Sequence, residues 1–129
     1  MSIQQSSQPQ RQTDLIKTVL ETLTNWDVKP QDQITLLGLP KDTKPRTLGR
    51  FRVGALLPQA DDFLQRAHYI LSIQNAVNSI FPHNAAAANY WVTTPNGYFG
   101  GKSPLEAMLN NDIEGMKYVV DHLNGVDGW

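Results

Sequence analysis

The amino-acid sequence predicts an all-α protein, in which a helix-turn-helix-like N-terminal region packs with a smaller C-terminal helical region. Three observations support this fold class. Apolar residues recur at intervals of three and four, prolines and glycines separate the resulting segments, and no stretch alternates convincingly as a strand would. The chain has 129 residues, 40% of them hydrophobic and 18% charged. That is enough for one domain with a core, or for two small halves that share one.

The N-terminal region begins with a polar segment and continues with two helices. Residues 1–12 are mostly glutamine and serine, which bury little apolar surface, so we expect a disordered tail there. The first helix is expected from about Asp14 to Trp26, where apolar residues have helical spacing. A short second helix is expected to begin at Pro30 and to end before Gly38, because proline suits a first helical turn and glycine commonly follows the last.

A basic segment follows the second helix. From Lys44 to Arg52 the chain carries four positive residues and no acidic one, and Lys41 lies just upstream. This segment is expected to form a third helix with its basic residues outward, and Asp42 or Thr43 can cap it. Its apolar residues are expected to reach the core: Leu48, Phe51 and Val53.

The longest helix is expected over residues 58–81. Pro58 lies in or just before its opening turn, and Asp61 and Asp62 suit the positive end of the helix dipole. Pro82 ends the helix. Its expected buried stripe comprises Phe63, Ala67, Ile70, Leu71, Gln74, Val77 and Phe81.

The C-terminal region, residues 82–129, is expected to contain three short helices. Asn84 can cap the first, and Pro95 ends it. The stretch "SPLE" at 103–106 is a capping box, in which the side chains of the first and last residues accept hydrogen bonds from each other's backbone N–H. It starts the second helix, and Asp112 can cap the third.

The connection before the capping box is rich in aromatic residues and glycine. Tyr90, Trp91, Tyr98 and Phe99 surround an Asn-Gly turn. Packing between helices is the usual role of such residues. The glycine pair at 100–101 also lets the backbone approach another surface closely. We therefore expect part of this loop to contact a partner.

The sequence predicts a binding protein rather than an enzyme, with no catalytic residue, metal or cofactor. It has no cysteine, and its three histidines, His68, His83 and His122, lack ligand-like spacing. The glycines near residue 100 lack the lysine and serine or threonine arrangement of a phosphate-binding loop. No apolar run is long enough to cross a membrane, and the N-terminal residues lack the pattern of a secretory signal. We expect no membrane association and a cytoplasmic location.

The second and third helices predict a helix-turn-helix, whose basic helix would enter the major groove of DNA. The expected DNA contacts are Lys41, Lys44, Arg46, Thr47, Arg50 and Arg52. Of these, Arg46, Thr47 and Arg50 are expected to face bases, and the other three to contact phosphates. The alternative interpretation is a solvated basic face, which is common on small helical proteins.

The C-terminal region resembles a known family. The stretch "WVTTPNGYFGGKSPLEAML" (91–109) combines a tryptophan, a Pro-Asn turn, a glycine pair and a Ser-Pro-Leu helix start. The matching residues are Trp91, Pro95, Asn96, Gly100, Gly101, Ser103, Pro104 and Leu105. This pattern resembles the toxin-binding domain of Xre/MbcA/ParS-type antitoxins. Residues 13–81, including the long helix, more loosely resemble the Xre-like helix-turn-helix region of the same family.

The resemblance implies an antitoxin of a type II toxin–antitoxin system. Such a protein neutralises a cognate toxin, often of the RES type that degrades NAD, by obstructing the toxin's active site with its C-terminal region. The resemblance also implies a homodimer whose complex with the toxin binds operator DNA and regulates its own operon. The residues expected to contact the toxin are Gly100, Gly101, Lys102, Asn124, Gly125, Val126, Asp127, Gly128 and Trp129.

Two other functions stay open from the sequence. One is a stand-alone helix-turn-helix transcription regulator without a toxin, for which the basic helix would be the whole function. The other is an adaptor that uses the same C-terminal fold to bind a different protein. A stoichiometric toxin partner would distinguish the antitoxin from both.

Overall fold

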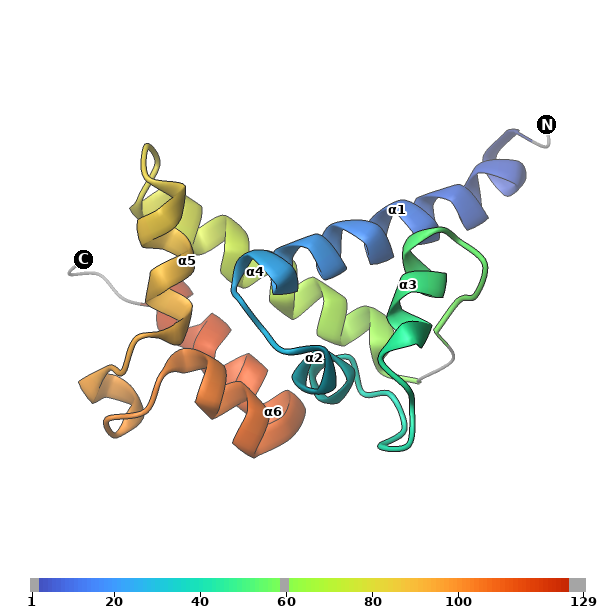
Figure 1. Ribbon diagram of the computed structural model, residues 1–129. Coiled ribbons are helices and arrows are strands. Elements are labelled where there is room, and N and C mark those ends of the chain that lie inside the picture. Colours follow the sequence, from blue (N-terminus) through green and yellow to red (C-terminus); the bar gives the residue numbers. More distant parts are fainter. Residues whose placement is uncertain (1–2, 59–60, 126–129) are drawn as a thin grey trace.

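A computed structural model describes residues 3–58 and 61–125 of the chain (Figure 1). These residues form helices and connecting loops without a strand, which confirms the all-α class. The elements are α1 (Ile3–Asn25), α2 (Pro30–Leu36), α3 (Arg46–Arg52), α4 (Phe63–Ile80), α5 (Ala85–Thr93), the short 3₁₀ helix η1 (Gly97–Phe99) and α6 (Pro104–Gly125).

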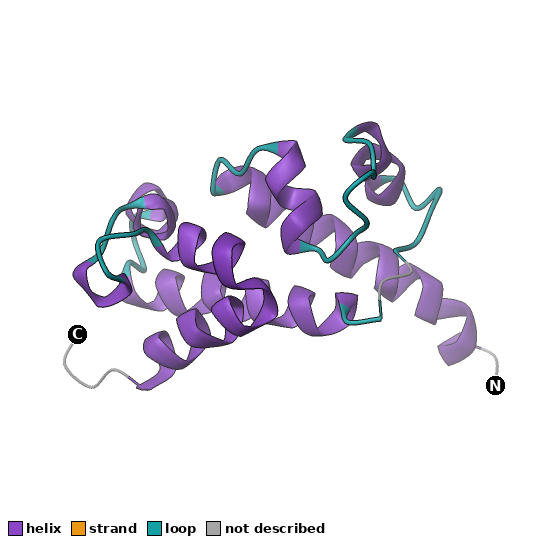
Figure 2. Cartoon of the chain, turned by 90° about the horizontal axis from the view of Figure 1, so that it is seen from below, coloured by secondary structure: helices purple, strands orange, loops and turns teal. Residues whose placement is uncertain are grey.

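The helices are arranged along the two long ones, α1 and α4, which pack against each other. α3 packs on α1, whereas α5 and α6 pack on α4 and on each other, and α2 lies against α6. α3 therefore lies toward the end of the molecule where α1 begins, and α5 and α6 lie toward the other end (Figure 1). Figure 2 shows from below that the start of α1 and the end of α6 lie far apart.

One cluster of buried apolar residues joins all six α-helices. Val19, Leu20 and Leu23 of α1 are fully buried, and each such side chain contributes roughly 1.5–3 kcal/mol of burial free energy. Trp26 is also buried, and its indole Nε1 donates a 2.7 Å hydrogen bond to Oε1 of Gln74 on α4. This bond explains why a glutamine lies on the apolar stripe of α4.

The first helix begins earlier than the sequence suggested. α1 starts at Ile3, so residues 3–12 are helical rather than part of a disordered tail, while residues 1–2 lie outside the described residues. Glutamine is a good helix former, and each residue added to an existing helix gains one backbone hydrogen bond without the cost of forming a new first turn. The packed part of α1 can therefore extend the helix toward the N-terminus.

α2 and α3 agree with the sequence only in part. α2 begins at Pro30 as predicted. The expectation that Asp42 or Thr43 caps α3 is wrong, because the residue at its N-cap is Pro45, without a side-chain cap. Leu48 and Phe51 are buried as predicted, but Val53 is 77% exposed because α3 ends one residue before it.

α4 is shorter than expected, since it begins at Phe63 rather than near Pro58. Asp62 occupies its N-cap position, but the Asp62 carboxylate makes no capping hydrogen bond and lies 3.0 Å from Nε of Arg66 instead. The predicted stripe is buried at Phe63, Ala67, Ile70 and Val77, and half-buried at Leu71, Gln74 and Phe81. Arg66 and Ile73 are buried as well, which the sequence did not indicate.

Candidate functional site

The most specific local structure of the chain precedes and opens α6. Ser103 is buried, and its Oγ accepts a 3.0 Å hydrogen bond from the backbone N–H of Glu106. In return, Oε1 of Glu106 accepts a 2.9 Å hydrogen bond from the N–H of Ser103. The predicted capping box is therefore confirmed in both directions, and Pro104 takes the first helical position. It fixes the direction in which the chain enters α6.

The loop before this box, residues 96–102, is closed by its own backbone. Asn96 donates its N–H to the carbonyl of Lys102 at 3.0 Å, and its carbonyl accepts the N–H of Gly101 at 3.1 Å. The Asn96 side chain accepts the N–H of Tyr98 at 2.9 Å. The loop is thus a fixed turn held by three groups of its first residue: the N–H, the carbonyl and the side-chain oxygen of Asn96.

The glycine pair in this loop has a conformation that other residues rarely adopt. Gly100 and Gly101 have φ of 70° and 85°, both in the left-handed region. Both are exposed, and a Cβ at either position would meet no atom within 4 Å. Backbone conformation, not crowding inside the molecule, therefore requires glycine here, and the backbone of this turn is open to an approaching surface.

An aromatic cluster supports the loop from beneath. Phe99 is buried and packs edge-on against Trp91, with ring centroids 6.4 Å apart. His122 of α6 stacks parallel to Trp91 at 6.4 Å and lies 3.8 Å from the Tyr98 ring. Tyr98 also stacks on Tyr118 of α6 at 5.5 Å. These contacts attach the loop to the second half of α6.

Burial and neighbouring groups shift two pKa values in this cluster. Partial burial lowers the pKa of His122 below its ordinary 6.5, because desolvation disfavours the charged imidazole. A hydrogen bond with the Tyr98 side chain raises the pKa of Tyr118. Tyr98 and Tyr118 remain 52% and 47% exposed, so the cluster presents two stacked phenol rings to solvent.

An open groove lies beside the cluster, where α4, α5 and α6 end. Its walls are mostly apolar and comprise Ala76, Ser79, Ile80, Phe81, Trp91, Leu123 and Asn124. Trp91 belongs to both features, since it lines the groove and stacks on His122. The loop at 96–102 and the last turn of α6 therefore lie at the same end of the molecule.

Comparison with known proteins identifies this region. Residues 76–128 match the family model described as the antitoxin Xre/MbcA/ParS C-terminal toxin-binding domain. The chain belongs to the Xre/MbcA/ParS antitoxin family. The matched segment begins inside α4 and includes the loop at 96–102, the capping box and the aromatic cluster. The described part of this segment is thus the toxin-binding domain of that family, whose partner is a toxin.

A second comparison covers most of the chain. An uncharacterized protein of Sinorhizobium fredii (strain NBRC 101917 / NGR234), y4oB, is 32% identical over 104 residues. The alignment covers 80% of this chain and 76% of the relative. The similarity therefore extends upstream of the toxin-binding domain into the N-terminal helices.

The residues predicted to contact the toxin fall into two groups in this family member. Gly100, Gly101 and Lys102 are exposed on the closed loop, and Asn124 and Gly125 form the end of α6. The remaining four, Val126, Asp127, Gly128 and Trp129, lie outside the described residues. Tyr118 and His122 were not anticipated as members of this site, although their spacing of four residues on one helix face would have allowed it.

The residues predicted to contact DNA lie on and before α3, which packs on α1. Lys41, Lys44, Arg46 and Arg50 are exposed, and none of them forms an ion pair among the described residues. Thr47 and Arg52 are half-buried, and Arg52 donates a 3.3 Å hydrogen bond to Oγ1 of Thr24 on α1. The structure thus leaves four of the six side chains available to a partner.

The connection between α2 and α3 differs from that of a standard helix-turn-helix. It comprises the nine residues 37–45, whereas the usual turn has about three or four. α2 packs on α6 rather than mainly on α3. The two helices therefore lack the tight turn from which the sequence predicted a helix-turn-helix.

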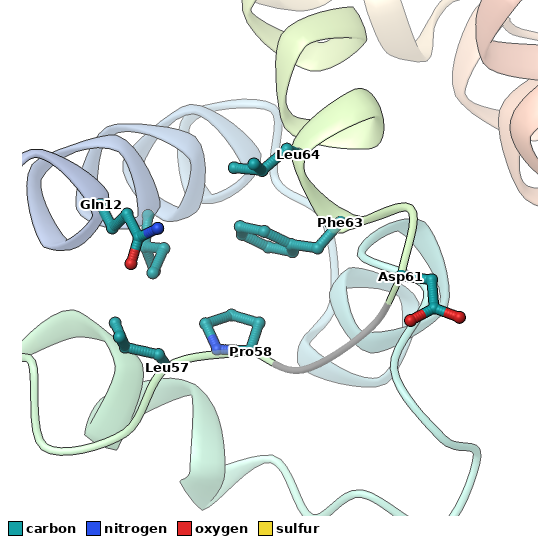
Figure 3. Close-up of a pocket in the computed structure, with 7 residues that line it drawn as sticks. Gln12, Leu57, Pro58, Asp61, Phe63 and Leu64 are labelled. Atoms are coloured by element: carbon teal, nitrogen blue, oxygen red, sulfur yellow. The ribbon is translucent and has the colours of Figure 1, made fainter. Parts of the chain in front are cut away.

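A further pocket lies at the opposite end from the toxin-binding loop. Between α1, the loop before α4 and the first turn of α4, it encloses about 200 Å³. Its lining comprises Gln12, Ile16, Leu57, Pro58, Asp61, Phe63 and Leu64. The rings of Pro58 and Phe63 face its interior, whereas the carboxylate of Asp61 points away from it (Figure 3). Ligand pockets usually measure about 300–1,000 Å³, so this recess is small for a ligand site.

The described residues contain no group of three or more metal-ligating side chains. No helix among them is long and apolar enough to cross a membrane.

Proposed function

We propose that this chain neutralises a RES-type, NAD-degrading toxin in the cytoplasm by binding it, without catalytic activity of its own. The observation that carries the proposal is the closed loop at 96–102, which lies inside the matched toxin-binding segment and presents its glycine pair outward. A rigid loop loses little conformational entropy on binding, so contacts to it convert efficiently into affinity.

The contact surface in this proposal has two parts. Gly100 and Gly101 let the toxin approach the loop backbone closely, and Lys102 supplies a positive charge beside them. The C-terminal tail, residues 124–129, starts at the groove and would reach into the active site of the toxin. Its sequence, "NGVDGW", combines apolar and acidic residues.

Deletion of residues 124–129 tests the role of the tail. We expect the shortened chain to lose most of its inhibition of the cognate toxin, measured as NAD consumed by the purified toxin at increasing amounts of the chain. The exchange Lys17→Ala, on an exposed position of α1, is the matched control and should inhibit like the unchanged protein. Full inhibition by the shortened chain would exclude the tail from the mechanism.

We also propose that the toxin-bound chain acts as a homodimer that binds the operator of its own operon. The support for this second activity is the group of four exposed cations, Lys41, Lys44, Arg46 and Arg50, which have no acidic partner among the described residues. A dimer would present two such groups to two half-sites. Because the connection between α2 and α3 is long, α3 would enter the major groove of DNA in a different orientation from the second helix of a standard helix-turn-helix.

The double exchange Arg46→Ala and Arg50→Ala tests DNA binding. We expect weaker operator binding with unchanged toxin binding, because α3 and the toxin-binding domain lie at different ends of the molecule. Gel-shift titrations at one fixed salt concentration measure this, since affinity for DNA depends steeply on ionic strength. Operator affinity equal to that of the unchanged protein would place any DNA contact elsewhere.

A further inference from the structure

Arg66 is a buried charge at the place where three helices meet. It lies in the first turn of α4 and is only 5% exposed. Nη2 donates to Oδ1 of Asp112 on α6 at 2.5 Å, and Nη1 donates to the carbonyl of Leu36 at the end of α2 at 3.3 Å. Nε lies 3.0 Å from the Asp62 carboxylate. One side chain therefore bridges α2, α4 and α6.

The partner on α6 has an unusual backbone conformation. Asp112 has φ of 57° and ψ of −144° and divides α6 into two helical segments, residues 104–111 and residues 113–125. A residue with a Cβ rarely adopts such angles, and it keeps them only where its surroundings impose them. The carboxylate expected to cap the next helical turn binds Arg66 instead. Arg66 thus bonds directly to the side chain of the residue at this kink.

The two segments of α6 also come unusually close at the kink. A Cβ added to buried Gly115 would lie 2.2 Å from the carbonyl oxygen of Ala107, so only glycine fits. The direction of the first segment relative to the second is therefore defined at a single joint. The first segment continues from the loop at 96–102, and the second carries Tyr118, His122 and Asn124.

We propose that Arg66 is a positioning residue for the toxin-binding surface: by holding Asp112 in its kinked conformation, it sets the orientation of the loop at 96–102. The expected effect on toxin binding rests on the proposed function. The effect on the orientation of the loop does not depend on that function. Arg66 itself is buried and does not need to contact the toxin.

Gly38 lies directly against the Arg66 side chain. Gly38, just after α2, has φ of 73°, and a Cβ there would lie 2.6 Å from Nε of Arg66. Any side chain at position 38 would have to displace the guanidinium. The exchange Gly38→Ala therefore disturbs Arg66 from α2 without altering α6, and its Cβ would also lie 3.0 Å from Oδ1 of Asp62.

Spin labels can test the geometric part directly, because the chain has no cysteine of its own. Exposed Lys17 on α1 and Lys102 on the loop are replaced by cysteine and labelled, and the distance between the labels is measured by pulsed electron paramagnetic resonance. We expect one narrow distance distribution for the labelled protein. Arg66→Met and Gly38→Ala should broaden or shift it while circular dichroism shows retained helix content, since methionine can replace the buried stem of arginine.

Two further exchanges distinguish the joint from a general loss of charge pairing. Asp112→Gly permits the same backbone angles but removes the bond to Arg66, and should also broaden the distribution. Asp62→Asn weakens the other ion pair at the start of α4 and should leave the distribution narrow. A narrow, unshifted distribution in both Arg66→Met and Asp112→Gly would overturn the proposal.

Binding measurements then separate this inference from the proposed function. The probe is the toxin product of the reading frame next to the gene, titrated calorimetrically. We expect Arg66→Met and Gly38→Ala to bind about tenfold or more weakly, and Asp62→Asn to bind like the unchanged protein. Unchanged affinity in Arg66→Met would refute the positioning role. A failure of the unchanged protein to bind would refute the proposed function, while the distance measurement would still decide the geometric part.

Discussion

His122 shows how one residue connects the loop to the rest of the toxin-binding domain. Its ring lies between Trp91 and Tyr98, and partial burial lowers its pKa below 6.5. The unfolded chain keeps the ordinary value of about 6.5. Between these two values the unfolded state binds more protons than the folded state, so the folded state is favoured as pH rises.

The free energy of unfolding should therefore depend on pH through His122. We expect its contribution to be fully present above about pH 6.5 and to be lost as the pH falls through the lowered value in the folded state. His122→Phe keeps an aromatic ring in the cluster and should reduce this acid-side loss. Urea denaturation at a series of pH values measures it, with the exposed His68→Gln as control. An identical pH profile for His122→Phe and the unchanged protein would contradict this account.

At the scale of elements, α3 and α6 differ in whether a glycine in the helix can be replaced by a larger residue. Gly49 lies in the middle of α3, is exposed, and would meet no atom within 4 Å if it carried a Cβ. Gly115 lies in α6, is buried, and would place a Cβ against the carbonyl of Ala107. Replacing glycine by alanine should thus raise the stability of the protein at position 49 and lower it at position 115.

Gly49→Ala should stabilise the protein by about 0.4–1 kcal/mol, because alanine favours the helix and restricts the unfolded chain. Gly115→Ala should destabilise it by more than about 1 kcal/mol, because backbone atoms must move apart. Denaturant titration of both variants measures the two signs. A stabilising Gly115→Ala would show that the joint in α6 is looser than described.

The sequence predicted correctly those helix starts that are capped by a neighbouring side chain. Asn84 caps α5 and accepts the N–H of Ala87, and Ser103 and Glu106 form their box, because such caps involve only neighbouring backbone. The start of α4 was predicted too early. The carboxylate of Asp62 is turned to Arg66, a partner that only the folded helix places next to it.

In the candidate site, too, local features could be predicted from the sequence and contacts between distant residues could not. From the sequence, the glycine pair at 100 and 101 was expected to let a partner approach closely; the structure adds that the left-handed backbone of both residues favours glycine. The contact of His122 with Tyr98 joins residues far apart in the chain, and the bond of Arg66 with Asp112 depends on how α6 packs on α4. Sequence spacing alone does not determine such contacts. The helix-turn-helix hypothesis also missed the nine-residue connection at 37–45, because α3 begins only after Pro45.

At the scale of the whole molecule, one core supports two surfaces at different ends. The toxin-binding domain, with its loop and groove, is formed by the end of α4, by α5 and by α6, whereas the basic side chains lie around α3. α2 and Arg66 connect the N-terminal helices to α6. This arrangement allows one chain to hold a toxin and DNA at once in the function that we propose.

Neutralisation of a toxin is the central claim, and titration tests it most directly. The product of the reading frame next to the gene is purified, its NAD consumption is measured, and the chain is added in steps. We predict that activity falls to a stoichiometric end point at which a stable complex elutes from a sizing column. Undiminished NAD consumption with no complex at any ratio of the two proteins would contradict the account.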